Sequence, residues 1–312
     1  MVFEDNERIE NSIIKGVDYL VSKQNEDGSI TLENDKTWQV WETANAILAA
    51  HNADKEKKPF LEKAVNFLLS CQRKDGSFYY TISYENDEYC METTSIGVLA
   101  LTITQKNVSK NIDFILSKQN PDGSWEIGIP RITKYRCWPS ITGYTLNTLL
   151  SMNVSSDQIS KGIKFLLKEQ QENGSWGSKW MYYDTPYYPI HAILPALKLN
   201  GLKNDERYLK AIRFIEKNQN KDGSWEYEST DKPRPSVSLR TALALNSLLV
   251  SPNQSDLKCI EKGIKWLINA QKNNGCWDGG YFVNWPGKKE DIYTACLAIR
   301  ALKQFNELHK KY

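Results

Sequence analysis

Aromatic side chains gather in the stretches that precede six apolar segments of the chain. Indole and phenol faces attract positive charge, at roughly 0.5–2 kcal/mol per contact, so several around one pocket could hold an apolar ligand and stabilise a cation on it. Basic residues share these stretches, and arginine can hold a phosphate group by two parallel hydrogen bonds. We take the following as candidate binding residues: Trp38, Trp41, Tyr89, Cys90, Tyr135, Arg136, Trp138, Tyr183, Tyr187, Tyr188, His191, Arg240, Trp285 and Tyr293.

A plainer role is open for each of these residues. Aromatic residues at the junctions of repeats often fill the core, and we expect about half of this set to do so. The basic residues of these stretches, with Lys134, Arg234, Lys288 and Lys289 among them, could be solvated charges. Arg240 stands apart because it follows Leu239 at the start of an otherwise apolar segment.

One sequence motif, which we call the repeated phrase, occurs six times. It consists of a glutamine, two variable residues, Asp-Gly or Asn-Gly, a serine or cysteine, and then an apolar residue. The glutamines stand 48, 47, 51, 49 and 52 residues apart, by subtraction of their positions: Gln24, Gln72, Gln119, Gln170, Gln219 and Gln271. A steady period of this length indicates repeated units, none of which can bury its apolar face alone.

Each unit predicts a pair of helices. Apolar residues stand seven, four and three positions before most of the glutamines, which is helical spacing, and the glycine that follows is a helix stop. A second apolar segment with few charges comes next in each unit, which predicts a helix buried on all sides. These segments lie near 41–50, 92–103, 140–151, 187–199, 237–249 and 292–303.

The arrangement of the pairs follows from the end units. An open solenoid usually has end units with a polar outer face, whereas the first and last units here resemble the others. We therefore expect an all-α fold, a closed (α/α)6 barrel or toroid of six helix hairpins, as a single domain over 1–312. Every inner helix would start at the same end of the ring, so the aromatic stretches should converge there.

Composition narrows the classes of function. A net charge of +2 and the lack of long basic runs argue against nucleic-acid binding. The N-terminus has no signal-peptide pattern and no apolar stretch approaches ~20 residues, so we expect a cytoplasmic protein, with peripheral membrane contact left open. The six cysteines stand apart from one another, which suits small buried side chains in a reducing compartment.

The repeated phrase resembles the Gln-Trp repeat of the squalene–hopene cyclase and class II terpene cyclase family, whose barrels are related to protein prenyltransferase β-subunits. Three other segments resemble that family: Met181-Tyr-Tyr-Asp-Thr-Pro-Tyr-Tyr-Pro-Ile-His-Ala-Ile-Leu-Pro-Ala-Leu197, Pro235-Ser236 through Thr241-Ala-Leu-Ala-Leu245, and Trp277-Asp-Gly-Gly-Tyr-Phe282. The resemblance covers nearly the whole chain and matches the family's catalytic barrel.

The resemblance also implies a catalytic acid. Class II cyclases protonate an alkene with the middle aspartate of an Asp-x-Asp-Asp-Thr-Ala motif, which aligns here with Cys90-Met-Glu92-Thr93-Thr94. Glu92 would be the acid, and Cys90 stands where a supporting aspartate is expected, so His191 or Tyr89 would have to support it instead. The alternative is that Glu92 only lines its helix N-terminus, favoured by the helix dipole, as Glu42 could in the first unit.

The function implied is protonation-initiated cyclisation of a linear isoprenoid or isoprenoid diphosphate. Protonation needs no metal or other cofactor, although Mg²⁺ could accompany a diphosphate. The family's active site lies between two barrels, so a homodimer or partner protein would have to close the cavity. The leading alternative is a non-catalytic toroid that binds a lipid, peptide or partner protein.

Two further enzyme classes fit less well. A zinc prenyltransferase needs a cluster of zinc ligands, whereas the three histidines are scattered and Asp291 with Cys296 cannot hold zinc alone. A carbohydrate-active barrel would use paired carboxylates with stacking tryptophans, and the six Gln-Trp-type phrases argue against it.

Overall fold

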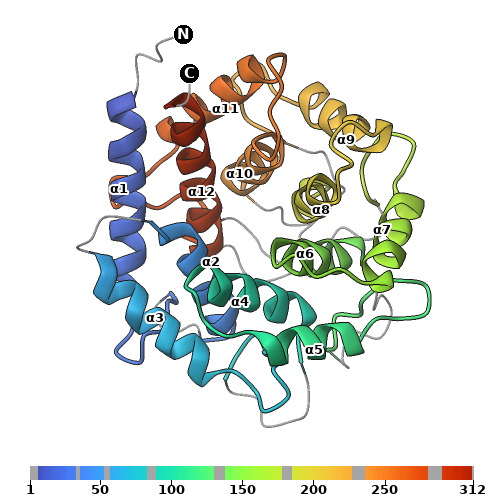
Figure 1. The fold of residues 1–312 in the computed structure, drawn as a ribbon. Helices are drawn as coiled ribbons and strands as arrows, with labels where there is room; N and C mark the ends of the chain where they lie inside the picture. The colour runs from blue at the N-terminus through green and yellow to red at the C-terminus, as the bar shows by residue number, and fades with distance from the viewer. Residues whose placement is uncertain are drawn as a thin grey trace.

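The structure, a computed structural model, describes residues 6–32, 36–52, 57–82, 89–129, 138–177, 185–226, 236–279 and 290–310. Helices within these ranges alternate between an outer and an inner ring, as Figure 1 shows. The outer ring consists of α1 (Asn6–Ser22), α3 (Lys58–Ser70), α5 (Ser109–Ser117), α7 (Asp157–Glu169), α9 (Glu206–Lys217) and α11 (Leu257–Asn269). The inner ring consists of α2 (Gln39–Ala50), α4 (Met91–Ile103), α6 (Pro139–Ser151), α8 (Tyr187–Leu199), α10 (Val237–Leu248) and α12 (Ile292–His309).

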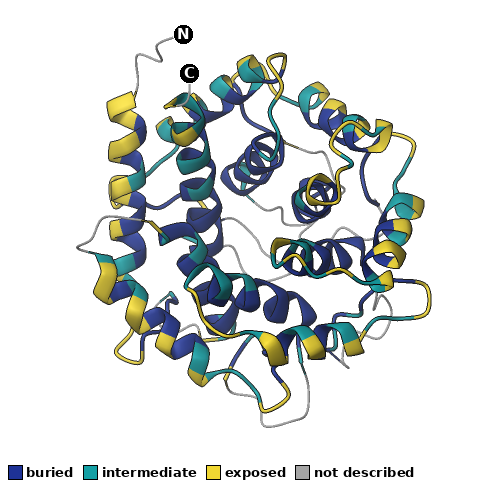
Figure 2. Cartoon of the chain, in the orientation of Figure 1, coloured by how far each residue is buried: buried dark blue, intermediate teal, exposed yellow. Residues whose placement is uncertain are grey.

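The two rings differ in how they are buried, as their sequences predict. Outer helices bury one stripe and keep charged residues in solvent, whereas inner helices are buried nearly all round (Figure 2). In α9, for example, the buried residues are Tyr208, Ala211, Ile212, Phe214 and Ile215, at helical spacing. The inner helices agree with the predicted segments, except that α12 continues six residues beyond the predicted end at 303.

The repeated glutamine joins each unit to the next. The side-chain amide of Gln119 donates to the backbone carbonyl of Gly123 in its own turn, at 3.0 Å, and to that of Gln158 at the start of the next outer helix, at 2.7 Å. The glutamines at 24, 170, 219 and 271 make the same pair of bonds. Gln72 instead donates to the side chain of Asn111 in the next outer helix.

The glycine of the phrase has a second role besides ending the turn. Gly123 has φ +91°, and a β-carbon there would lie 2.4 Å from the carbonyl oxygen of Lys161 in the next outer helix. Only glycine combines this backbone conformation with so close an approach. The six turns therefore pack directly against the neighbouring helix backbones.

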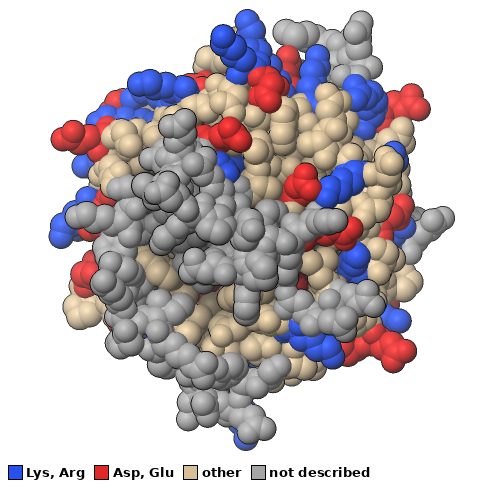
Figure 3. Space-filling model, turned by 180° about the vertical axis from the view of Figure 1, so that it is seen from behind, with Lys and Arg blue, Asp and Glu red and all other residues tan. Residues whose placement is uncertain are grey.

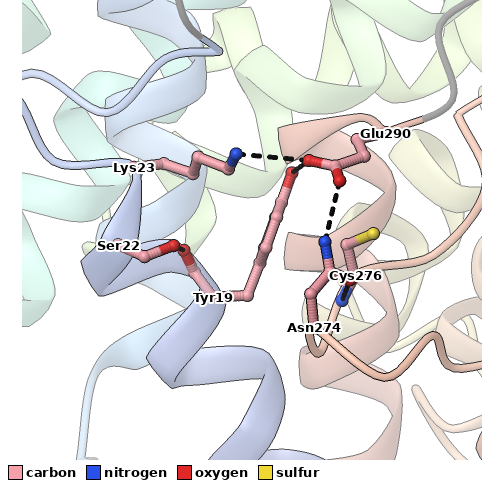
Figure 4. Close-up of polar contacts among 6 residues, drawn as sticks. All are labelled: Tyr19, Ser22, Lys23, Asn274, Cys276 and Glu290. Atoms are coloured by element: carbon pink, nitrogen blue, oxygen red, sulfur yellow. Dashed lines mark hydrogen bonds and ion pairs between the residues drawn. The ribbon is translucent and has the colours of Figure 1, made fainter.

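The ring closes with the same bond that links the other units. Gln271, in the turn after α11, donates to the backbone carbonyl of Ser12 in α1 at 2.9 Å. Figure 4 shows a polar cluster near this seam, in which Glu290 accepts from the Tyr19 hydroxyl at 3.2 Å and from Asn274 at 2.7 Å, and pairs with Lys23 at 3.2 Å. The fold is therefore the closed (α/α)6 toroid that the sequence predicts, and not an open solenoid.

The outer surface of the described part carries mixed charge. Figure 3 shows Lys and Arg side chains interspersed with Asp and Glu around one face of the ring. None of the helices in the described ranges combines the length and apolar character that a membrane span requires.

Candidate active site

Glu92 lies in the first turn of α4, at the end of the ring where the inner helices begin. Its side chain is 3% exposed, and Cys90 is the helix N-cap residue immediately before this first turn. The hydroxyl of Tyr188, from the first turn of α8, donates a hydrogen bond to Glu92 Oε1. No hydrogen bond to the second oxygen, Oε2, is found among the described residues, so one carboxyl oxygen is engaged and the other is not.

Three tyrosines from three inner helices lie near this carboxyl group. We call Tyr144 of α6, Tyr188 of α8 and Tyr293 of α12 the tyrosine cluster. The hydroxyls of Tyr144 and Tyr293 are 3.2 Å apart, and the ring centroid of Tyr188 lies 5.7 Å from that of Tyr144 and 6.4 Å from that of Tyr293. Because α6 and α12 face each other across the ring (Figure 1), the cluster occupies the ring axis at this level.

Two further candidate residues contact the tyrosine cluster. Trp41 of α2 packs on Tyr293 with ring centroids 4.3 Å apart, and His191 of α8 lies edge-on to Tyr144 at 6.2 Å. These rings come together because the inner helices begin at the same end of the ring, and the rings belong to the first two turns of those helices. The result is a buried carboxyl group beside a cluster of electron-rich faces.

Burial controls the acidity of Glu92. Loss of solvation raises the pKa of Glu92 from its ordinary value of 4.5 to about 7, and the hydrogen bond from Tyr188 partly opposes that rise. A carboxyl group with this pKa carries a proton for much of the time near neutral pH. The Tyr188 bond favours the carboxylate that remains after the proton has left.

The neighbouring groups stay neutral. Burial, and then the charge of Glu92, raise the pKa of the Cys90 thiol to about 12, and the same causes raise the pKa of Tyr144. Burial, and then the charge of Arg300, lower the pKa of His191 to about 3. Among these groups, therefore, Glu92 is the one whose pKa suits proton transfer near neutral pH.

The supporting group of Glu92 differs from the expectation. Tyr188 makes the hydrogen bond for which the sequence suggested His191 or Tyr89. His191 contacts Tyr144 instead, while Tyr89 packs edge-on against Phe114 of the outer helix α5, with centroids 5.0 Å apart.

Two other candidate residues, Tyr187 and Trp38, contact other parts of the ring. Tyr187 donates to the carbonyl of Glu226 at 3.3 Å and packs near Phe214 of α9, and half-buried Trp38 packs on Tyr80. Trp138 is buried directly before α6. Tyr135, Arg136, Tyr183 and Trp285 lie outside the described residues, as do Lys134, Arg234, Lys288 and Lys289.

Arg240 is a buried residue and not a solvated charge at the rim. Its side chain is 3% exposed in the first turn of α10, after the N-cap Ser236.

Asp291 has a defined structural role, because its Oδ2 accepts hydrogen bonds from the backbone N–H and the hydroxyl of Thr294 at the start of α12. Within the ranges described, no three His, Cys, Asp or Glu side chains lie close enough together to hold a metal ion.

The sequence reasoning missed Tyr144 and Arg300. Both lie farther along their inner helices than any of the candidate residues predicted from the sequence. A signal was available, because a large or charged polar residue inside an otherwise apolar inner helix has few places to go except the ring axis.

Comparisons with known proteins bear on this arrangement. A family model described as "Squalene-hopene cyclase C-terminal domain" matches residues 2–130, 35–184 and 137–306. The chain is 36% identical over 291 residues to a squalene-hopene cyclase from Schizosaccharomyces japonicus, in a match that covers 76% of this chain and 44% of the cyclase. It spans less than half the length of the curated relatives it matches.

Solved structures share the fold at low sequence identity. A variant of the type II terpene cyclase MstE from Scytonema, in complex with geranylgeranyl dihydroxybenzoate, superposes with a TM-score of 0.76 at 14% identity, over 98% of this chain and 100% of that one. A possible member of the GH105 family from Salmonella enterica superposes with a TM-score of 0.69 at 12% identity, over 98% and 96%. The toroid alone therefore does not decide the chemistry.

Proposed function

The chain belongs to the squalene-hopene cyclase C-terminal domain family, and on that premise we propose that it cyclises a linear isoprenoid by protonation, with Glu92 as the acid. The observation that carries the proposal is the buried Glu92 carboxyl group, with a pKa of about 7, one hydrogen bond from Tyr188 and a tyrosine cluster beside it.

The first step is a proton transfer to carbon. The O–H bond of Glu92 breaks, its proton adds to one carbon of the terminal alkene, and the other alkene carbon becomes a tertiary cation. An alkene is a weak base, so the acid must hold a proton, be fixed in place and be shielded from water. Burial lets Glu92 hold its proton and shields it from water. The hydrogen bond from Tyr188 fixes the carboxyl group in place and stabilises the carboxylate that is left behind.

The following steps need a stabilised cation. The next alkene of the isoprenoid attacks the cation and forms a carbon–carbon bond. The reaction ends when a C–H proton is lost from the last cation. Faces of Tyr144, Tyr188, Tyr293 and Trp41 would stabilise the cation, each by roughly 0.5–2 kcal/mol. The overall reaction is an isomerisation, and its proton transfers need no metal, while Mg²⁺ would accompany a diphosphate head group.

The substrate class is an isoprenoid with a free terminal alkene. In the Scytonema cyclase, the bound ligand carries a geranylgeranyl group. The structural match covers 100% of that cyclase. That full coverage supports a single toroid domain over 1–312 as sufficient for the fold of a type II cyclase. Closure of the site by a second copy or by a partner protein stays part of the proposal.

The test is a product assay with four substrates. The purified chain is incubated with squalene, farnesyl diphosphate, geranylgeranyl diphosphate and geranylgeranyl dihydroxybenzoate, with and without Mg²⁺, and the extracts are analysed by mass spectrometry. We expect a cyclic isomer of at least one substrate, and no cyclic product from Glu92→Gln. Unchanged substrates throughout, with the wild-type protein folded, would remove the enzymatic proposal.

A non-catalytic binding toroid is the second candidate. The observation that favours it is the hydrogen bond between Tyr144 and Tyr293 across the ring axis, because side chains fill space that a folded substrate would need. This candidate predicts that geranylgeranyl compounds bind without being converted, and that Glu92→Gln leaves their affinity unchanged.

A further inference from the structure

A cavity lies at the end of the ring opposite to Glu92. Its volume is about 330 Å³, and its lining comes from the C-terminal halves of the inner helices, including Asn147 and Ser151 of α6, Leu199 of α8 and Leu249 directly after α10. Ser151 and Leu199 are exposed at its rim, so the cavity meets solvent. A volume of this size falls at the lower end of the range of small-molecule pockets, roughly 300–1,000 Å³.

The charge of this cavity is one-sided. Arg300 of α12 and Lys198 of α8 line it, and its lining contains no Asp or Glu among the described residues. Lys198 is already engaged, because its ammonium donates to the backbone carbonyl of Val250 at 2.6 Å. The Arg300 guanidinium makes no hydrogen bond or ion pair with the described residues, so its donors are available to a ligand.

The partial negative charge at the C-terminal ends of the inner helices does not neutralise the positive charge of Arg300. Carbonyl groups at helix C-termini attract cations, and lysines already satisfy several of them here. Lys198 takes the carbonyl of Val250, and Lys303 takes those of Ala49 and His51. Arg300 lies in the middle of α12, more than two turns from its C-terminal end, so it does not serve as a cap.

The imidazole of His191 also lines the cavity, and one of its nitrogens makes no hydrogen bond with the described residues. His191 is 4% exposed, and its Nδ1 atom has no hydrogen-bond partner among the described residues. A buried ring nitrogen normally finds a partner, because leaving it unsatisfied costs free energy. A neutral imidazole at this position can complete its bonding with a bound molecule.

We propose that this cavity binds a small organic oxyanion. Arg300 holds the carboxylate or phosphate head group by paired hydrogen bonds, His191 offers a further polar contact, and a short apolar body packs on Leu99, Leu199 and Leu249. The site is separate from Glu92, since neither Glu92 nor the tyrosine cluster lines the cavity, and it does not depend on the proposed cyclase activity.

Calorimetric titration tests the site with three probes of equal chain length. Hexanoate carries a carboxylate, hexyl phosphate carries a phosphate, and 1-hexanol carries no charge. We expect at least one anion to bind and 1-hexanol not to bind. Arg300→Gln should weaken that binding by at least about tenfold, as expected for loss of hydrogen bonds to a charged group. The stronger of the two anions identifies the head group.

Matched variants distinguish binding in this cavity from binding elsewhere on the protein. Arg213→Gln removes an arginine from the exposed face of α9 and should leave the affinity unchanged, and so should Glu92→Gln. Ser151→Trp should block the rim and abolish binding, and it decides the matter if Arg300→Gln does not fold. Absence of binding by both anions, equal binding of 1-hexanol, or full affinity in a folded Arg300→Gln or Ser151→Trp protein would overturn the proposal.

Discussion

The hydroxyl of Tyr188 donates a hydrogen bond to Glu92 Oε1, although the two residues stand 96 positions apart in the chain. The bond spans from α8 to α4, which are not neighbours in the inner ring, since α6 lies between them (Figure 1). A contact of this kind needs the successive helix pairs that carry α4, α6 and α8 to curve around the ring axis. Glu92 therefore owes its environment to several units and not to its own unit alone.

Removal of the Tyr188 hydroxyl should make Glu92 a weaker acid. Tyr188→Phe keeps the ring but loses the bond that favours the carboxylate, so the pKa of Glu92 rises above about 7. The fall in turnover at high pH should move to higher pH, while turnover at pH 6 drops by about tenfold or more. A pH–rate profile measures both. Tyr187→Phe, whose hydroxyl contacts Glu226, is the matched control. An unshifted profile in Tyr188→Phe would remove its role toward Glu92.

Glu92 should lower stability as the pH rises. Its pKa is about 7 in the folded protein and 4.5 as the ordinary value, so the folded state binds its proton more tightly. The free energy of unfolding should fall as the pH rises from 4.5 to 7, by about 3 kcal/mol from this group, and then level off. We expect the difference in stability between Glu92→Gln and wild type to change steadily over that window in urea titrations.

The substitution of an exposed glutamate checks this dependence on pH. Glu172→Gln, on the surface of the turn after α7, measures the effect of replacing a carboxylate by an amide outside the site. A Glu92→Gln difference that is flat between pH 4.5 and 7 would contradict the burial of an ionisable carboxyl group.

The Glu290 cluster at the closing seam should respond to pH in the opposite sense. Burial raises the pKa of Glu290, but hydrogen bonds from Lys23, Asn274 and Tyr19 outweigh it and hold the pKa below 4.5. Its contribution to stability is therefore present above pH 4.5 and is lost as the pH falls through the lower, folded value. Glu290→Gln should cost about 1 kcal/mol at pH 7 and less at pH 3, in thermal or urea unfolding.

The glycine of the repeated phrase should be intolerant of a side chain. Gly123→Ala combines a strained φ with a contact of 2.4 Å to the Lys161 carbonyl, so we expect a loss of about 2–4 kcal/mol. Gly201 has φ +80° and nothing within 4 Å of an added β-carbon, so Gly201→Ala should cost only about 1 kcal/mol. Equal losses in the two variants would show that the close approach at Gly123 contributes nothing.

The fold could be predicted from the sequence because its signals repeat. Six copies of one phrase fix the helix pairs, and the likeness of the first and last units indicates closure, which the bond from Gln271 to Ser12 confirms. The end of α12 was predicted short because the last helix has no following unit to limit it, and it continues to His309.

The site was harder to predict because neighbouring residues on a helix point in different directions. Tyr187 and Tyr188 are adjacent, yet successive helical residues are turned by about 100°, so Tyr188 reaches Glu92 while Tyr187 packs toward α9. The spacing of residues along the chain does not reveal which of the two faces the axis. Tyr144 was missed because it lies farther along its helix than the candidate residues do.

The most direct test of the central claim is the origin of the added proton. The wild-type protein and Glu92→Gln are incubated in D₂O with whichever isoprenoid is converted, and the products are examined by mass spectrometry and NMR. We predict one deuterium per product molecule, on the carbon that receives the proton in the first step, and no cyclic product from a folded Glu92→Gln protein. A cyclic product without deuterium, or unchanged turnover in Glu92→Gln, would contradict Glu92 as the acid.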